Sequence, residues 1–247
     1  MTIALRADAV TRRFGALTAV DTVSLSMEDR RIHAVIGTNG AGKSTLINLL
    51  SGELPLSAGR VTLHGEDITA WSQPRRAGAG LNRSYQRNNV FLPLSVRENC
   101  RLAAQARQPR AWRFWEAAQA CRASQSAADD AMERAGLAEH AQRPAASLSH
   151  GQKRQLEVAM CLATAPKVLL LDEPLAGMGA EESARMLELM RRLRQDHAIL
   201  LVEHDMDAVF AVADAITVMV NGSVLATGAP ADVRANPDVQ AAYLGGH

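Results

Sequence analysis

Residues 32–45 read IHAVIGTNGAGKST, and this stretch decides the fold. Its apolar first part, residues 32–36, has the composition of a buried strand, and residues 37–45 fit the phosphate-loop pattern G-x-x-x-x-G-K-[ST]. A helical pattern starts at Leu46, which completes the strand, loop and helix order that this motif requires. The glycines let several backbone N–H groups converge on one anion, and the helix adds its positive N-terminal end. The stretch therefore predicts an α/β core with a phosphate-binding loop.

Within this loop, Lys43 is predicted to reach the β- and γ-phosphates of a nucleotide, and the Ser44 hydroxyl to bind Mg²⁺. The chain has 27 Lys and Arg residues, but lysine occurs only at positions 43, 153 and 167. A lysine at this site fits because a compact ammonium suits the loop better than a guanidinium fork. The alternative is a glycine-rich turn before a structural helix. The other loop residues assigned to the nucleotide are Asn39, Gly40, Gly42 and Thr45.

A second motif, residues 168–174, reads VLLLDEP. An apolar strand there ends in two adjacent carboxylates, and α/β sheets place ligands at the carboxyl ends of their strands. Asp172 is suited to hold Mg²⁺ through water, and Glu173 to polarise the water that attacks a γ-phosphate. The alternative is a strand that ends in solvated acids.

Bulk composition sets limits on the class of protein. The 247 residues can form one large domain or a core with a subdomain, and the net charge of +1 gives no reason to expect nucleic acid as a partner. Cys100, Cys121 and Cys161 are far apart and odd in number, which fits a reducing compartment where thiols act as small apolar fillers. Residues 1–10 contain no apolar signal core, and no stretch approaches the roughly 20 apolar residues of a spanning helix. We therefore expect a water-soluble chain, which leaves docking on a membrane partner open.

Short apolar runs and helical patterns alternate along the chain. Residues 168–171, 198–202 and 216–220 are predicted strands of a parallel sheet, with a helix over 182–195 between the first two and a hairpin turn at Asn221-Gly222. Residues 3–10, 20–27 and 61–64 look like strands without long helices between them, which predicts a small antiparallel sheet. The fold class is therefore α/β, with a mostly parallel sheet flanked by helices and an N-terminal antiparallel β subdomain.

The strand signal disappears between residues 94 and 145, where Ala and Arg dominate. We expect this segment to be a helical subdomain inserted into one domain, whose nucleotide-binding core is formed by residues 1–93 and 146–247. A short helix is expected over residues 237–244.

A third motif, residues 148–152, reads LSHGQ. Ser149 can cap the free N–H groups of a helix that starts there, and a plain capped helix is the simplest interpretation. The order of the motifs, with Gln86 and His204 at their places between and after them, resembles the ATP-binding subunit of ATP-binding-cassette (ABC) transporters over essentially the whole chain. The string Leu-Ser-x-Gly-Gln just before the second acidic motif is highly specific to that family.

The resemblance implies a role for each matching residue. Phe14 matches the aromatic that stacks on adenine, with a core-packing Phe as the alternative, and Val20 is assigned to the nucleotide beside it. Gln86 matches the glutamine that senses Mg²⁺ and the attacking water, and His204 matches the switch histidine near the γ-phosphate. The residues that match the motif contacting ATP held by the opposite subunit are Ser149, Gly151 and Gln152.

The same resemblance implies ATP and Mg²⁺ as cofactors and ATP hydrolysis coupled to transport. It implies membrane permease subunits and a second ATP-binding subunit as partners, with a periplasmic solute-binding protein indirectly. The resemblance then places this chain on the cytoplasmic face of the inner membrane, as a peripheral subunit. Two positions depart from the pattern: His150 replaces a small residue at a tolerant position, and Gly179 stands where the family usually has an Asp that couples the two ATP sites.

Three local strings resemble one subgroup, the ATP-binding proteins of importers for branched-chain and other hydrophobic amino acids. They are residues 172–178, residues 202–206 and residues 236–245. The segment from 86 to 148 resembles the larger of the two ATPase subunits that pair in these importers. The alternatives are the ATPase of a lipopolysaccharide exporter, a urea or amide importer ATPase, and a soluble ABC protein. A non-hydrolysing regulator is disfavoured by the presence of Glu173 and His204.

Residues 112–115, WRFW, concentrate three aromatics among several arginines, including Arg101 and Arg122. One interpretation is a helix that packs one face inside the insert while the arginines are solvated. The other is a docking surface for the membrane subunits or for anionic lipid headgroups.

Overall fold

The computed structural model describes residues 2–84, 90–106 and 121–244, and these residues form two compact units. The sheet unit comprises Met1–Arg83, Lys167–Glu173 and Met190–His247. The helical unit comprises Ser84–Pro166 and Pro174–Leu189. The predictions for Gln86 and for residues 112–115 fall outside the described residues.

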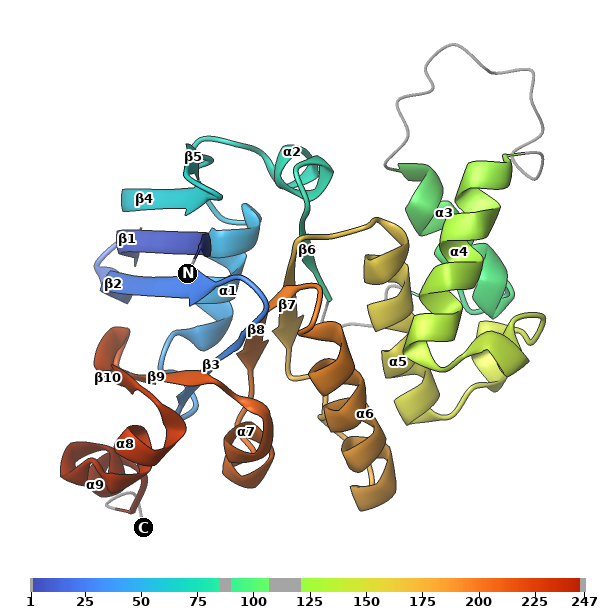
Figure 1. The fold of residues 1–247 in the computed structure, drawn as a ribbon. Helices are drawn as coiled ribbons and strands as arrows, with labels where there is room; N and C mark the ends of the chain where they lie inside the picture. The colour runs from blue at the N-terminus through green and yellow to red at the C-terminus, as the bar shows by residue number, and fades with distance from the viewer. Residues whose placement is uncertain (1, 85–89, 107–120, 245–247) are drawn as a thin grey trace. The chain divides into compact units, whose positions relative to one another are not determined.

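The sheet unit is built on a six-stranded sheet in the order β10-β9-β3-β8-β7-β6 (Figure 1). All neighbouring strands run parallel except β10, which pairs antiparallel with β9 at one edge. The strands are β3 (Ile32–Gly37), β6 (Leu81–Arg83), β7 (Val168–Asp172), β8 (Ala198–Val202), β9 (Ala215–Val220) and β10 (Ser223–Gly228). Every residue of β3, β7 and β8 is buried, which explains their continuous apolar sequences. The predicted mostly parallel sheet is confirmed.

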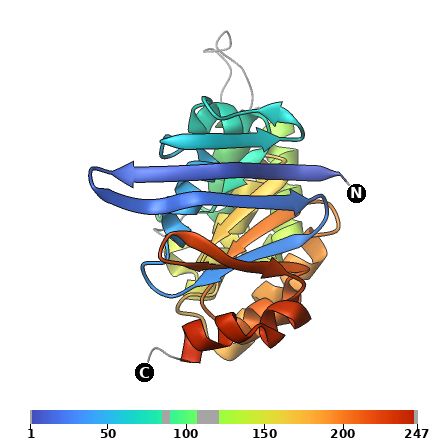
Figure 2. The ribbon, with the colours of Figure 1, turned by 90° about the vertical axis from the view of Figure 1, so that its left-hand side faces the viewer.

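A second sheet in the same unit has the order β2-β1-β4-β5 and is antiparallel throughout (Figure 2). Its strands are β1 (Ile3–Phe14), β2 (Leu17–Glu28), β4 (Ala58–Leu63) and β5 (Glu66–Asp67). The predicted antiparallel sheet is confirmed, although β1 and β2 are longer than their apolar patterns indicate. Helix α1 (Lys43–Ser51) supplies four buried apolar side chains to one core shared by both sheets. The phosphate-loop motif thus leads from a central strand directly into the core helix.

The other helices of the sheet unit are short. They are α2 (Gln73–Gly78), α7 (Met206–Val212), α8 (Pro230–Ala235) and α9 (Pro237–Leu244), the last of which has the bounds predicted from sequence. Asn221 and Gly222 both have positive φ, 49° and 83°, and join β9 to β10 as the predicted hairpin turn.

The helical unit contains α3 (Val96–Ala106), α4 (Arg122–Ala135), α5 (His150–Ala163) and the first part of α6 (Ala180–Leu193). Two short 3₁₀ helices, η2 (Ala138–His140) and η3 (Ala145–Ser147), lie between α4 and α5. The described residues between 94 and 145 are thus mainly helical, and the exact limits of an inserted subdomain stay a prediction.

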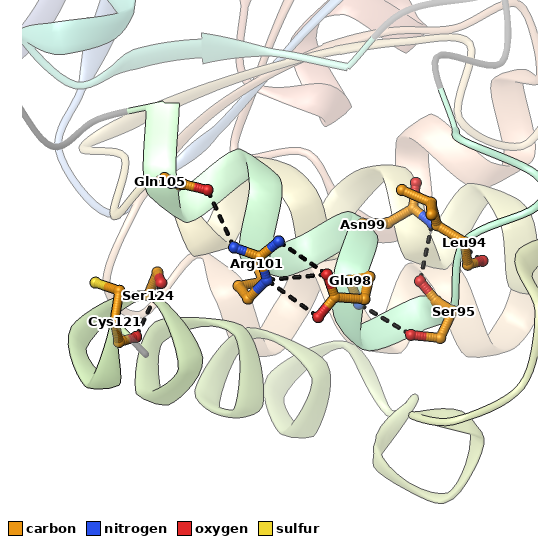
Figure 3. Close-up of polar contacts among 8 residues, drawn as sticks. All are labelled: Leu94, Ser95, Glu98, Asn99, Arg101, Gln105, Cys121 and Ser124. Carbon is orange, nitrogen blue, oxygen red and sulfur yellow. Dashed lines mark hydrogen bonds and ion pairs between the residues drawn. The ribbon is translucent and has the colours of Figure 1, made fainter. Parts of the chain in front are cut away.

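Arg101 in α3 corrects the expectation that the arginines of this segment are solvated. The residue is only 6% exposed, and its guanidinium is bound by Glu98, with a nitrogen–oxygen distance of 2.8 Å, and by Gln105 (Figure 3). On the same helix, the fully buried Asn99 donates to the carbonyl of Ser95. Because both polar groups have partners within or next to α3, their burial is compatible with a packed helical core.

Two of the three cysteines are buried, as predicted for apolar fillers. These are Cys100 and Cys121, whereas Cys161 is partly buried, and none of the three forms a disulfide within the described residues. Burial raises the pKa of Cys100 to about 12, so its thiol is inert at neutral pH. Among the described residues, no helix combines the length and the apolar character needed to cross a bilayer.

Candidate nucleotide site

A cavity of about 530 Å³ opens over the phosphate loop in the sheet unit. Its walls come from the start of β2, the loop before α1, the end of β7 and the β9–β10 turn. The lining residues are Leu17, Thr18, Ala19, Asn39, Gly40, Ala41, Gly42, Lys43, Ser44, Thr45, Glu173, Asn221 and Gly222. The six loop residues assigned to the nucleotide from sequence all line this cavity.

Gly42 determines how α1 meets the cavity. Its φ is +96°, and a Cβ there would lie 2.5 Å from the Ala19 carbonyl oxygen, so only glycine fits. Gly42 is also the N-cap of α1 and provides no side-chain cap. The N–H groups of the first helical turn therefore remain available for an anion at the positive end of the helix.

The ammonium of Lys43 is held by the loop itself. Its Nζ donates to the Gly37 carbonyl at 2.7 Å and to the Thr38 carbonyl at 3.1 Å, and the residue is 6% exposed. Burial lowers the pKa of Lys43, and the charges of Glu173 and Asp172 oppose this effect. The Lys43 ammonium is therefore well placed to bind an anion, because a charged phosphate oxygen is a stronger hydrogen-bond acceptor than the neutral carbonyls that bind it here.

Asp172 ends β7 and is only 2% exposed. Its Oδ2 accepts from Arg83 Nη2 at 2.9 Å, and the Arg83 guanidinium also binds Asn48 in α1 and Glu53 just after it. Burial raises the pKa of Asp172, and the neighbouring Arg83 opposes this. Sequence reasoning did not assign Arg83 a role, because an arginine at the end of a short strand usually points into solvent.

Glu173 follows Asp172 and lines the cavity. Its backbone has φ of +47°, a left-handed conformation that is rare for a residue with a side chain. Its N–H donates to the Val202 carbonyl at 2.9 Å, so the unusual backbone is held by the neighbouring strand β8. Strain of this kind costs on the order of 1–3 kcal/mol and clusters at functional sites.

The third motif lies in the helical unit. Ser149 is the N-cap of α5 and forms a capping box, because its Oγ accepts from the Gln152 N–H and its own N–H donates to Gln152 Oε1. The capped helix predicted from sequence is confirmed. A cavity of about 320 Å³ lies at this helix end and is lined by Gly136, His140, Ser149, Gly151, Gln152, Gln155, Glu182 and Arg185.

Three further assigned residues lie outside the lining of the cavity. Phe14 is 43% exposed at the end of β1, with the Arg12 guanidinium 4.5 Å from its ring centre, which does not match the alternative of a core-packing Phe. Val20 is fully buried in the core of the sheet unit. His204 follows β8 with a side chain that is 61% exposed, next to the buried Glu203.

Sequence reasoning missed the walls contributed by Leu17, Thr18 and Ala19 and by the β9–β10 turn. The turn was identified as a hairpin, but nothing in its sequence placed it beside the phosphate loop. The signal that connects them is structural, since the Gly222 N–H donates to the Ala41 carbonyl at 3.1 Å.

The residues present fit a nucleoside triphosphate with Mg²⁺. The cavity combines an uncapped helix end, a buried ammonium and a volume suited to a small ligand. The Ser44 hydroxyl and the Asp172 carboxylate are the hard oxygen donors that Mg²⁺ prefers. Within the described residues, no three or more His, Cys, Asp or Glu side chains are arranged to hold a metal ion by themselves, so a magnesium ion here would draw its other ligands from phosphate and water.

Comparison with known protein families matches residues 20–176 to "ABC transporter" and residues 223–247 to "Branched-chain amino acid ATP-binding cassette transporter". The chain is 42% identical to the high-affinity branched-chain amino acid transport ATP-binding protein LivG of Salmonella typhimurium, covering 94% of each. It is 38% identical to the corresponding protein BraF of Pseudomonas aeruginosa, covering 98% of this chain and 97% of that one.

Among solved structures, the fold is similar to that of an ATP-binding cassette of an ABC transporter in its ADP conformation. The TM-score is 0.87 at 29% identity, and the match covers 99% of this chain and all of the other.

Proposed function

The chain belongs to the ABC transporter family, and we propose that it is the ATP-binding and hydrolysing subunit of a membrane importer for branched-chain amino acids. The observation that carries the proposal is the cavity in which the phosphate loop and Glu173 meet. The family membership of the chain and the position of Glu173 beside the phosphate loop both fit phosphoryl transfer from ATP to water.

Each site residue of the sheet unit has a defined role in this proposal. Lys43 leaves the Gly37 and Thr38 carbonyls to bind the β- and γ-phosphates, and the N-terminus of α1 receives the remaining negative charge. Ser44 and Asp172 hold Mg²⁺, which when bound neutralises charge that develops on the phosphates. Glu173 orients the attacking water and accepts its proton. Phe14 is assigned to the adenine side of the site. Val20, which the sequence also assigned to the nucleotide, is fully buried in the core and has no exposed surface for a ligand, so it is not part of this proposal.

A second ATP-binding subunit completes the site. Ser149, Gly151 and Gln152 at the start of α5 are assigned to the γ-phosphate of ATP held by the other subunit. His204 and Gln86 are assigned to sensing the γ-phosphate and the attacking water. ATP-driven closure and reopening of this pair then moves the membrane permease subunits.

The transported solute is proposed from the relatives, since both are named for branched-chain amino acid transport. The match of residues 223–247 to a family with the same solute in its name supports it independently. In this arrangement the chain lies on the cytoplasmic face of the membrane, and a periplasmic binding protein delivers the solute. A lipopolysaccharide exporter or a urea and amide importer is the competing outcome.

The variant Glu173→Gln tests the hydrolysis step. It is expected to bind ATP normally and to hydrolyse it at less than about a hundredth of the wild-type rate, because the amide cannot accept the proton. Glu181→Gln, which neutralises an exposed acid in α6, is the matched control and should behave as wild type. A Glu173→Gln protein with more than about a tenth of wild-type turnover would show that Glu173 is not the base.

Co-purification from native membranes tests the transport assignment. The chain should be recovered with permease subunits, and vesicles containing the complex should accumulate leucine in an ATP-dependent way. Accumulation of urea instead of leucine, or recovery with lipid-export components, would refute the proposed solute.

A further inference from the structure

We propose that Glu182 acts as an internal competitor for the phosphate position at the start of α5, and so sets how readily this chain accepts the ATP of a second subunit. The inference rests on the proposed function, because it concerns the regulation of the same composite site. It is carried by the position of the Glu182 carboxylate in the helical unit.

The carboxylate of Glu182 lies directly against Ser149 and Gly151, two of the three residues assigned to the incoming phosphate. Ser149 Oγ donates to Glu182 Oε1 at 2.9 Å. A Cβ placed on Gly151 would lie 2.5 Å from the Glu182 carboxyl carbon and 2.7 and 2.9 Å from its two oxygens. Such distances are too short for any side chain, so the absence of a Cβ at position 151 is what admits the carboxylate.

The local charges explain why the carboxylate is attracted to this place. The N-terminus of α5 carries a partial positive charge, and α5 has no acidic residue in its own first turn. Glu182 comes from the first turn of α6 and supplies that negative charge from outside the helix. A carboxylate and a phosphate oxygen use the same donors, the Ser149 hydroxyl and the helix end, so the two anions cannot bind there together.

The structure also offers a place for a displaced carboxylate. Arg185 lies three residues after Glu182 in α6 and lines the same cavity of about 320 Å³. Residues at this spacing are neighbours on one helix face, so a rotamer change can bring Glu182 towards the Arg185 guanidinium. The Arg185 side chain is 61% exposed, and its ion pair with Glu181 spans 3.9 Å, a loose contact that can be exchanged.

Two states follow for the start of α5. With Glu182 on Ser149, the site is closed to a phosphate, and with Glu182 turned away it is open. Because a ligand binds only the open fraction, its apparent affinity falls by that fraction, and neutralising Glu182 removes this reduction. The chain therefore binds the second subunit's ATP less tightly than an otherwise identical chain with glutamine at position 182.

The direct test measures anion binding at the start of α5 in the isolated chain, with inorganic phosphate as the probe. All proteins carry Lys43→Ala, which weakens phosphate binding at the other site, and the backbone amide NMR signals of Gly151 and Gln152 report binding. Glu182→Gln is expected to half-saturate these signals at a phosphate concentration lower by about tenfold, the low end of what a charge-assisted hydrogen bond contributes. Glu181→Gln removes the same charge from the neighbouring position and should leave the half-saturation point unchanged.

A second measurement follows ATP-dependent pairing of chains that carry Glu173→Gln, by sedimentation over a series of ATP concentrations. Adding Glu182→Gln should lower the ATP concentration for half-maximal pairing by about tenfold, whereas Glu181→Gln should not change it. Glu182→Asp, which keeps the charge on a shorter side chain, should give an intermediate value. Thermal unfolding checks that each variant is folded.

The outcomes separate the two hypotheses. If the Gly151 and Gln152 signals respond to phosphate alike with and without Glu182→Gln, Glu182 does not occupy the phosphate position and this inference is overturned. A wild-type chain that fails to bind ATP at the Lys43 loop would instead refute the proposed function, and the amide measurement would still decide the role of Glu182.

Discussion

Replacing Arg83 with methionine should destabilise the sheet unit and release Asp172 from its fixed position. The Arg83 side chain is 8% exposed and that of Asp172 is 2% exposed, so the ion pair between them is buried. Removing one partner of a buried pair typically costs about 3–5 kcal/mol, because the other charge stays buried without compensation. The second ion pair of Arg83, with the 45% exposed side chain of Glu53, contributes less than about 1 kcal/mol to the free energy of unfolding.

A double-mutant cycle isolates the Arg83–Asp172 interaction from these other effects. Arg83→Met alone is expected to lower the free energy of unfolding by about 3 kcal/mol. In the double variant with Asp172→Asn, the buried carboxylate is gone, so the loss should be smaller than the sum of the two single losses by at least about 1.5 kcal/mol. Glu53→Gln is the matched control, with an expected loss below about 1 kcal/mol.

Urea unfolding of the four proteins of the cycle and of the Glu53→Gln control, without nucleotide or metal, measures these values. A titration of ATP with and without Mg²⁺ connects them to the site. Arg83→Met should weaken ATP binding in the presence of Mg²⁺ and leave binding without the metal nearly unchanged. If the sum of the two single-variant losses equals the loss of the double variant to within about 0.5 kcal/mol, the reasoning is refuted. Such additivity would show that the two side chains do not interact energetically.

The remaining predictions concern other parts of the chain. Lys43→Ala should abolish tight binding of a fluorescent ATP analogue, and unchanged affinity would contradict the phosphate-loop assignment. Ser149→Arg should keep ATP binding by single chains but prevent ATP-driven pairing in sedimentation, and mixing it with Lys43→Ala protein should partly restore hydrolysis. Burial lowers the pKa of His33 to about 4, so the free energy of unfolding should fall as the pH drops from about 6.5 towards 4, by at most about 1.4 kcal/mol per pH unit. His33→Gln should flatten this dependence in urea unfolding, and an unchanged slope would show that another group causes it.

Patterns that depend on neighbours in sequence were predictable. The phosphate loop, the continuously apolar strands and the capping box at Ser149 each follow from local chemistry, and the structure contains the loop, the strands and the cap. The ends of β1 and β2 were not predictable, because register shifts interrupt the alternation on which a strand prediction depends. The pairing continues to Phe14 and Leu17, and this is what brings the start of β2 into the wall of the cavity.

Features that depend on distant residues were missed for a different reason. Nothing in the local sequence of Arg83 shows that it is buried against α1 and β7, since its partners lie about 30 and 89 positions away. Glu182 likewise looks like one of two solvated acids in the first turn of α6. Its contact with Ser149 spans 33 positions, and only the folded chain shows that Glu182 and Glu181 have different surroundings.

The two carboxylates at the end of β7 show how such differences arise between adjacent residues. Asp172 is the last residue of β7, and Glu173 is the first residue after the strand. The left-handed backbone at Glu173, with φ of +47°, then ends the strand and leaves this side chain at the cavity wall. Asp172 stays buried beside Arg83, and this contact fixes the carboxylate that we propose as a ligand of Mg²⁺. The roles we propose, metal binding for Asp172 and proton transfer for Glu173, therefore agree with the different surroundings that the backbone gives these two adjacent carboxylates.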